Sequence, residues 1–172
     1  MPYLFAQSVK AAQTGVPVMR PMVMEYPNDP LCYTLDTQYM LGDSLLVAPV
    51  FNENGQRSLY LPEGEFTNFF TGEVVQGGRM IHGTYDYMTL PVFVPPNTLL
   101  AVGSDCSVEY NYNENVTIYA YCITEQTLDL FDKDGVKRAV VMAKRVGDDI
   151  VFAVEGDAPD IKFKKVLNNG II

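Results

Sequence analysis

The chain has 172 residues, of which 48% are hydrophobic, and its formal net charge is −9. This apolar content is typical of a folded globular protein with a real core and excludes a disordered chain. Because phosphate binding needs clustered Lys and Arg, the acidic balance argues against nucleic-acid partners and against anionic membrane surfaces.

The sequence also lacks the usual targeting signals. No apolar run is long enough to span a bilayer, and the opening residues, Met1 to Phe5, have neither a basic region nor a cleavage pattern. The compartment therefore stays open, with the cytoplasm slightly favoured over the periplasm or secretion.

Cysteine and histidine are too sparse for a zinc site. Cys32, Cys106 and Cys122 form no CxxC pair, and His82 is the single histidine. We expect buried free thiols, with one disulfide as the alternative if the protein is secreted.

The first stretch is predicted to be a helix over residues 2–14. Pro2 suits a first-turn position, and Gly15 and Pro17 supply the stop. Apolar residues recur at helical spacing, so this helix is expected to pack on a partner surface: Leu4, Phe5, Val9 and Ala12.

A strand and a second helix are predicted next. Residues 18–24 are apolar on both faces, which is typical of a buried parallel strand, although Pro21 conflicts with a central position. Residues 36–41 are predicted to form a short helix that ends at Gly42. Helix, buried strand and helix in this order correspond to the last part of a (β/α)8 barrel, but one strand cannot close a barrel alone.

From Leu45 the pattern becomes all β. Short runs punctuated by Gly and Pro predict a first β-sandwich with strands at 45–50, 58–61, 65–69, 73–75, 79–82, 89–94 and 98–102. Thr71 and Gly72 predict a hairpin turn between two of them.

A second boundary falls near residues 103–105. The rest is more polar and predicts a second small sandwich with strands at 107–112, 117–121, 128–132, 139–144, 149–154 and 162–166. Residues 132–135 faintly resemble a calcium loop, but the closing Glu is missing, so a hairpin turn is the better interpretation.

Six acidic residues are candidates for glycosidase chemistry, which uses two carboxyl groups: Glu25, Asp29, Asp36, Asp43, Glu63 and Glu65. Glu25 ranks first because it ends the barrel-like strand, where catalytic groups collect in barrels. A salt bridge or a loop cap is nevertheless the favoured role for Glu25. For Asp36 a helix cap is predicted, and for Asp43 a turn.

Other motifs favour structural roles. His82 has no GxSxG partner and is expected at a strand end or on the surface. Six aromatic residues crowd the first β region, and a core role is favoured over sugar stacking because the chain has no Trp: Tyr60, Phe66, Phe69, Phe70, Tyr85 and Tyr87.

Four ordered segments together resemble the C-terminal part of glycoside hydrolase family 31, the α-glucosidase and α-xylosidase family. They are Arg20 to Pro27, Gln38 to Val50, Tyr60 to Phe66 and Pro96 to Gly103. The resemblance covers residues 1 to about 103 well and the remainder more weakly. The segment Gln38 to Asp43 leans toward the bacterial α-xylosidase-like branch.

The resemblance implies a mainly β fold with a short α/β start. Residues 1–43 would be the C-terminal, incomplete end of the (β/α)8 catalytic barrel, 44–103 a proximal β-sandwich, and 104–172 a distal β-sandwich that is truncated in mid-strand. The family's nucleophile and acid/base are aspartates, both upstream of the region that this chain matches. No catalytic, cofactor-binding or metal residue is therefore assigned here, Glu25 included.

The function implied is that of the C-terminal part of a retaining α-glycoside hydrolase, inactive by itself and prone to associate. Its expected partners are the carbohydrate substrate of the parent enzyme and the remainder of the barrel, with no nucleic acid, no membrane and no cofactor, and the oligomeric state stays undetermined. The alternative is a non-catalytic carbohydrate-binding or structural β-sandwich module, which explains the aromatics but not the helix-strand-helix start.

Overall fold

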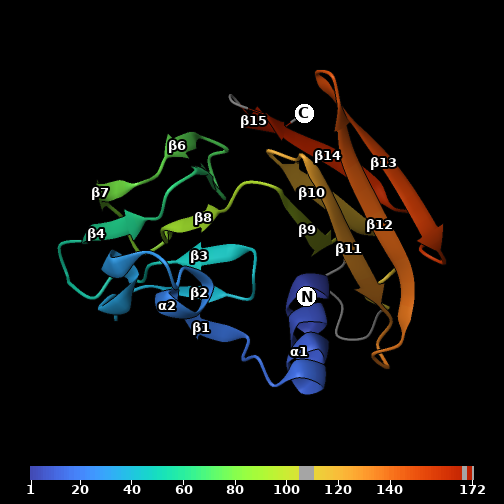
Figure 1. Ribbon diagram of the computed structural model, residues 1–172, viewed down its shortest axis with the longest axis horizontal. Helices are drawn as coiled ribbons and strands as arrows, with labels where there is room; N and C mark the ends of the chain where they lie inside the picture. Colours follow the sequence, from blue (N-terminus) through green and yellow to red (C-terminus); the bar gives the residue numbers. More distant parts are fainter. Residues whose placement is uncertain (105–110, 168–169, 172) are drawn as a thin grey trace. The chain divides into compact units, whose positions relative to one another are not determined.

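The computed structural model describes residues 1–104, 111–167 and 170–171 and is mainly β (Figure 1). Its contacts divide the chain into two compact units. Unit 1 consists of Met1–Val18 and Asn97–Leu167, joined by Ile171. Unit 2 consists of Met19–Pro96, joined by Gly170. Each unit is described by itself.

Unit 2 is built from short elements, shown in blue to yellow-green in Figure 1. They are β1 Met19–Pro21, α2 Met22–Glu25, the 3₁₀ turn η1 Pro30–Tyr33, β2 Tyr39–Leu41, β3 Leu45–Val47, β4 Gln56–Leu61, β5 Glu65–Asn68, β6 Val74–Gln76, β7 Arg79–Thr84 and β8 Val92–Val94. Six strands form one sheet in the order β1-β2-β3-β8-β5-β6, and β4 pairs with β7 in a separate ribbon. All of these pairings are antiparallel.

The core of unit 2 joins the ribbon to the sheet. Leu59 and Leu61 of β4 belong to the same buried cluster as Met40 of β2, Phe66 of β5 and Phe93 of β8. Burying such side chains contributes about 1.5–3 kcal/mol each, so this cluster holds the short strands together. The ribbon and the sheet therefore pack as two layers, which gives unit 2 its sandwich character.

Unit 1 has one helix and longer strands. They are α1 Pro2–Thr14, β9 Thr98–Gly103, β10 Val116–Tyr121, β11 Glu125–Phe131, β12 Lys137–Val146, β13 Asp149–Gly156, β14 Lys162–Leu167 and β15 Gly170–Ile171. One sheet has the order β15-β14-β10-β9 and the other the order β11-β12-β13. Strands β10 and β14 run parallel, whereas β9 with β10 and both pairs of the second sheet are antiparallel.

The two sheets of unit 1 share an aliphatic core. Ile118 of β10, Leu130 of β11 and Val141 of β12 lie in one buried cluster, as expected for the inner faces of a sandwich. Helix α1 joins this unit, with the rings of Phe5 and Tyr112 centred 4.5 Å apart. No helix of the described residues is long and apolar enough to cross a membrane.

Helix α1 has the predicted bounds, with Gly15 as its left-handed cap at φ 76°. Its buried face differs from the predicted apolar stripe. Tyr3 and Gln7 are buried, whereas Leu4 is exposed. Sequence periodicity located the helix correctly but did not identify the side that packs.

The prediction of a buried parallel strand over residues 18–24 is wrong. Strand β1 covers only Met19–Pro21 and pairs antiparallel with β2, and helix α2 follows at once. Pro21 explains the change because its fixed φ of −62° makes it the N-cap of α2 and its missing N–H restricts it to a sheet edge.

The short helix predicted over residues 36–41 is also wrong. Residues Tyr39–Leu41 form β2, which pairs on both sides, with β1 and with β3. Gly42 at φ 64° lies in the turn between β2 and β3, where the sequence predicts a helix end. A short apolar run does not distinguish a helix from a strand. Here the pairing with β1 and β3 favours the strand.

Most of the predicted β strands are confirmed within one to three residues at each end, including the β5–β6 hairpin around Thr71 and Gly72. The 132–135 turn closes the β11–β12 hairpin as predicted, since the Asp132 N–H donates to the Val136 carbonyl. The strand predicted over 107–112 lies mostly outside the described residues.

Candidate functional site

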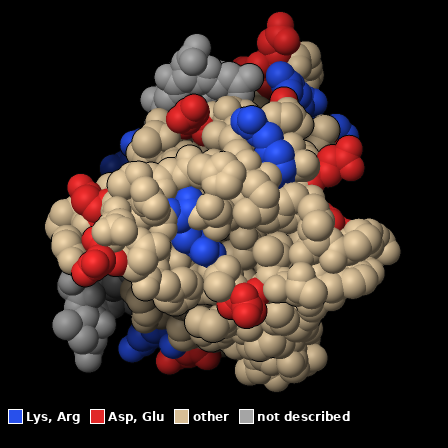
Figure 2. All heavy atoms as spheres, turned by 90° about the vertical axis from the view of Figure 1, so that its left-hand side faces the viewer, with Lys and Arg blue, Asp and Glu red and all other residues tan. Residues whose placement is uncertain are grey.

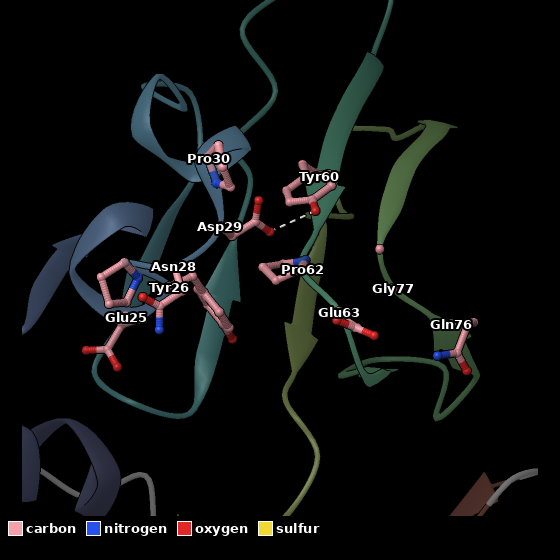
Figure 3. Close-up of a pocket in the computed structure, with 12 residues that line it drawn as sticks. Glu25, Tyr26, Asn28, Asp29, Pro30, Tyr60, Pro62, Glu63, Gln76 and Gly77 are labelled. Carbon is pink, nitrogen blue, oxygen red and sulfur yellow. Dashed lines mark hydrogen bonds between the residues drawn. The ribbon is translucent and has the colours of Figure 1, made fainter.

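The candidate site is a polar cleft of about 720 Å³ in unit 2 (Figure 3). One wall comes from the segment that leaves α2 and enters η1, and the other from the end of β4 and the turn before β7. The lining residues are Glu25 to Pro30, Tyr60, Pro62, Glu63 and Gln76 to Gly78. Three carboxylates thus reach one cleft: Glu25, Asp29 and Glu63.

Asp29 connects the two walls. One of its oxygens accepts a hydrogen bond from the Leu31 N–H at 3.0 Å, which caps η1, and the other accepts from the Tyr60 hydroxyl at 2.8 Å. Figure 3 shows the two side chains pointing toward each other. Burial, followed by the bond to Asp29 and its charge, raises the pKa of Tyr60 to about 12. The tyrosine therefore stays a neutral donor at physiological pH.

Gln38 fixes the base of the same wall. Its amide nitrogen donates to the Tyr60 carbonyl at 2.7 Å, and its amide oxygen accepts from the Tyr60 N–H at 2.8 Å. The side chain thereby replaces a strand partner for β4, and it is only 3% exposed. Leaving both backbone groups buried without partners is expensive, so Gln38 holds Tyr60 in place.

Glu25 is engaged in an ion pair. Its carboxylate accepts from the Arg20 guanidinium at 2.6 Å, and Arg20 is 4% exposed. Figure 3 shows the Glu25 carboxylate pointing away from the Asp29–Tyr60 pair. Burial, followed by the charge of Glu25, raises the pKa of Tyr26 to about 12. The salt bridge predicted for Glu25 is therefore present, with Arg20 as the partner.

A close approach of two loops forms the far rim. A Cβ on Gly77 would lie 1.9 Å from the Pro62 carbonyl oxygen, so only glycine fits at this position. The Gly77 N–H donates to the Gly64 carbonyl at 2.7 Å, which ties the β6–β7 turn to the β4–β5 turn. Glu63 lies on this rim with an exposed side chain.

The cleft presents one exposed carboxylate, that of Glu63. Two of its three carboxylates already hold the protein's own groups, Arg20 for Glu25 and Tyr60 for Asp29. A retaining glycosidase needs one free nucleophilic carboxylate and one protonated partner about 5 Å away. The contacts of Glu25 and Asp29 therefore stabilise a loop and do not form the acid/base pair of a glycosidase.

The remaining acidic candidates have local roles. Asp43 lies in the β2–β3 turn and accepts from the Ser44 hydroxyl at 2.9 Å, so its turn role is confirmed. Asp36 lies in an irregular segment, so the helix cap predicted for it is wrong. Among residues 1–104, 111–167 and 170–171, no group of three or more His, Cys, Asp or Glu could hold a metal ion.

His82 is exposed on β7, and its Nδ1 lies 2.7 Å from the Ser58 hydroxyl of β4. This agrees with the predicted surface role. Cys32 is a buried free thiol, as predicted. Its burial, followed by the charge of Asp29 and a hydrogen bond to it, raises the pKa of this thiol to about 11. Cys122 is half-buried, and Cys106 lies outside the described residues.

The core role predicted for the aromatics is only partly correct. Tyr60 and Phe66 are buried, at 5% and 1% exposure. Phe70 and Tyr87 are 61% and 99% exposed, so for them the prediction is wrong. Both lie in turns that follow strands, and alternation along a strand says nothing about a turn. Sequence reasoning also missed the burial of Arg20, which pairs with the nearby Glu25, and that of Gln38, whose partner Tyr60 is distant in sequence.

The described charges are dispersed. On the face shown in Figure 2, Lys and Arg atoms are scattered among neutral and acidic atoms. Four of the five ion pairs found among the described residues lie in unit 1, between Lys or Arg and a carboxylate on a neighbouring strand or turn.

Comparison with known proteins gives the family of this chain. The sequence model of the glycosyl hydrolase family 31 C-terminal domain matches residues 15–100. The chain belongs to glycoside hydrolase family 31. An α-xylosidase, XylQ, of Lactiplantibacillus pentosus is 34% identical over the whole chain, and an α-xylosidase of Emericella nidulans is 40% identical over 59% of it.

A solved structure supports the fold. The family 31 dextranase of Flavobacterium johnsoniae, in complex with isomaltotriose, superposes with a TM-score of 0.80 at 26% identity and covers 95% of this chain. The chain spans 23% of that dextranase, 24% of the L. pentosus enzyme and 14% of the E. nidulans enzyme. The matched part is therefore a fraction of each relative.

Proposed function

We propose that this chain is the C-terminal part of a retaining α-glycoside hydrolase that cleaves α-xylosidic or α-glucosidic bonds. The observation that carries the proposal is the family match over residues 15–100, in a chain that spans 24% of an α-xylosidase. The catalytic aspartates belong to the part of the parent enzyme upstream of this match, and the chain alone is inactive. In the proposed parent enzyme, residues 1–43 complete the barrel, and residues 44–103 and 104–172 form the proximal and distal β domains. This proposed division differs from the two contact units, because β1 and β2 share a sheet with β3 and β8 and α1 joins unit 1.

Exposed apolar side chains in unit 2 support a partner surface on the barrel-end segment. Met19 and Met24 are 60% and 47% exposed, and Leu31 and Tyr33 are 59% and 57% exposed. All four lie within 15 consecutive residues around α2 and η1, and clustered exposed apolar groups mark interaction surfaces. The remainder of the barrel is the partner that this surface would contact.

The cleft supports a bracing role in that assembly. The Arg20–Glu25 pair and the Asp29–Tyr60 bond stiffen the segment between β1 and η1. Rigid second-layer contacts hold catalytic loops in productive geometry. We therefore assign Glu25 and Asp29 to positioning this segment and not to bond cleavage.

A non-catalytic carbohydrate-binding module is the second candidate, and the exposure of Phe70 and Tyr87 favours it. The coding DNA upstream of the Met1 codon separates the two. An in-frame extension that encodes barrel strands bearing two aspartates is expected. An upstream stop codon with no barrel-coding frame would contradict the enzyme proposal and favour the module.

A further inference from the structure

A second cavity in unit 2 lies between the loop after β3 and the loop after β7. It has a volume of about 840 Å³ and shares no lining residue with the cleft described above. This volume falls within the range of about 300–1,000 Å³ that is usual for small-molecule sites. The cavity is therefore large enough for an oligosaccharide segment.

Two glycines fix the loops against each other. The Tyr85 N–H donates to the Gly55 carbonyl at 2.9 Å, and a Cβ on Gly55 would lie 2.0 Å from the Tyr85 carbonyl oxygen. A Cβ on Gly83 would lie 2.9 Å from the Tyr85 ring, so that ring lies against the β7 backbone. Tyr85 is thus immobilised as one wall of the cavity.

A capped turn presents a second aromatic ring. The Asp86 carboxylate accepts from the Met88 N–H at 2.9 Å and from the Thr89 hydroxyl at 2.8 Å. The turn places Tyr87 with its side chain 99% exposed. The turn fixes the backbone that carries Tyr87, so ordering the exposed ring is the main conformational cost at this residue when a ligand binds.

The chemistry of the lining selects the ligand class. Alongside the two tyrosines stand Glu53, Asn54 and Asp86, and the lining residues, all within the described chain, include no Lys or Arg. Aromatic faces suit the apolar faces of a sugar ring, and amide and carboxylate groups suit its hydroxyls. An anionic ligand would meet two carboxylates without a cation, and a purely apolar ligand would leave the polar groups unsatisfied.

We infer that this cavity is an ancillary carbohydrate-binding site. It holds a neutral oligosaccharide by stacking on Tyr87, while the Asn54 amide donates to and the Glu53 carboxylate accepts from the sugar hydroxyls. The choice of α-linked glucose oligosaccharides rests on the proposed function. The site binds the sugar without cleaving it. It would therefore keep a glucan near the enzyme between turnovers.

The test is a titration of the 172-residue chain with isomaltotriose, followed by backbone amide NMR shifts. We expect saturable shifts confined to residues 49–55 and 84–90, with a Kd of about 1 mM, typical of a shallow site with one aromatic anchor. Tyr87→Ala should weaken binding about tenfold, as for the loss of a single anchor, and Tyr87→Phe should retain it because the ring remains.

Phe70→Ala is the matched control. Phe70 is 61% exposed in a different turn of the same unit and does not line the cavity, so its loss should leave the affinity unchanged. Sedimentation of the same variants distinguishes a sugar site from a self-association surface.

Three results would overturn the inference. They are the absence of saturable shifts in the two loops, equal affinity of Tyr87→Ala and the native chain, and a loss of self-association in Tyr87→Ala without any sugar binding. Glucan binding by a chain that has no upstream barrel would leave this inference standing and refute the proposed function alone.

Discussion

Units 1 and 2 both form a β-sandwich, but their hydrophobic cores contain different kinds of side chain. The core of unit 1 is almost wholly small and aliphatic, drawn from strands of up to ten residues. The core of unit 2 includes Met22 of α2, Cys32 of η1, Tyr60 of β4 and Phe66 of β5. Several of the strands of this unit have only three or four residues. Long strands are stabilised by many ladder hydrogen bonds. Short strands make fewer of these bonds and depend more on large buried side chains and on specific polar contacts.

The polar contacts follow the same division. Unit 1 has ion pairs at its surface, such as Lys144 with Glu125, whereas unit 2 buries Arg20 and Gln38 to join segments that no ladder connects. Exposed pairs contribute about 0–1 kcal/mol each, whereas an unsatisfied buried group costs about 1–3 kcal/mol. Unit 2 should therefore be the more sensitive unit to single substitutions, and it is the unit with both candidate sites.

The largest expected effect is on the core of unit 2. Phe66→Ala removes a ring that is 1% exposed and should lower the free energy of unfolding of this unit by about 3–5 kcal/mol. Hydrogen exchange, read separately for residues 19–96 and 111–167, measures it. Tyr87→Ala, at a wholly exposed ring, should change the free energy of unfolding by under about 0.5 kcal/mol. Equal loss of protection in both units would contradict the division.

Next comes the buried amide. Gln38→Ala leaves the N–H and the carbonyl of Tyr60 without their partners and should cost about 2–4 kcal/mol of unfolding free energy. Gln76→Ala is the control, because its side chain is exposed and makes one long bond of 3.4 Å. Urea denaturation of both variants gives the difference, and similar midpoints would refute the role of Gln38.

Acid should act on the hairpin of unit 1. The Val136 N–H, assisted by Arg138 and the Asp134 N–H, lowers the pKa of Asp132 below its ordinary value of 3.8. Because the folded pKa is the lower one, this stabilisation is fully present above the unfolded value and is lost as the pH falls through the folded one. Asp132→Asn should flatten the loss of thermal stability of unit 1 as the pH falls below about 4. An unchanged acid profile would contradict this assignment.

The smallest effect is expected at the surface of unit 1. The side chains of Lys144 and Glu125 are 62% and 69% exposed, and the Lys144 Nζ lies 2.9 Å from the Glu125 Oε2. A double-mutant cycle with Lys144→Met and Glu125→Gln should give a coupling energy of about 0.2–1 kcal/mol that falls in high salt. A coupling energy above about 2 kcal/mol would mean that the pair is not a solvent-screened one.

The sequence predicted unit 1 better than unit 2 for a physical reason. The 132–135 turn and the strands beside it carry their own signals, so β11 and β12 were located from local pattern alone. In unit 2 the strand–helix switch at Pro21 and the β2 pairing are decided by partners far along the chain. Glu25 was identified with its favoured role, but the partners of Gln38 and Asp29 come together only in the fold.

We propose that this chain is part of an α-glycoside hydrolase whose catalytic groups lie outside it. The most direct test is hydrolysis of aryl α-xyloside and α-glucoside by the purified 172-residue chain, with circular dichroism to show that it is folded. No turnover by a folded, β-rich chain is the predicted result. Clear turnover that Glu25→Gln abolishes would contradict the account, because it would make Glu25 a catalytic acid and not the partner of Arg20.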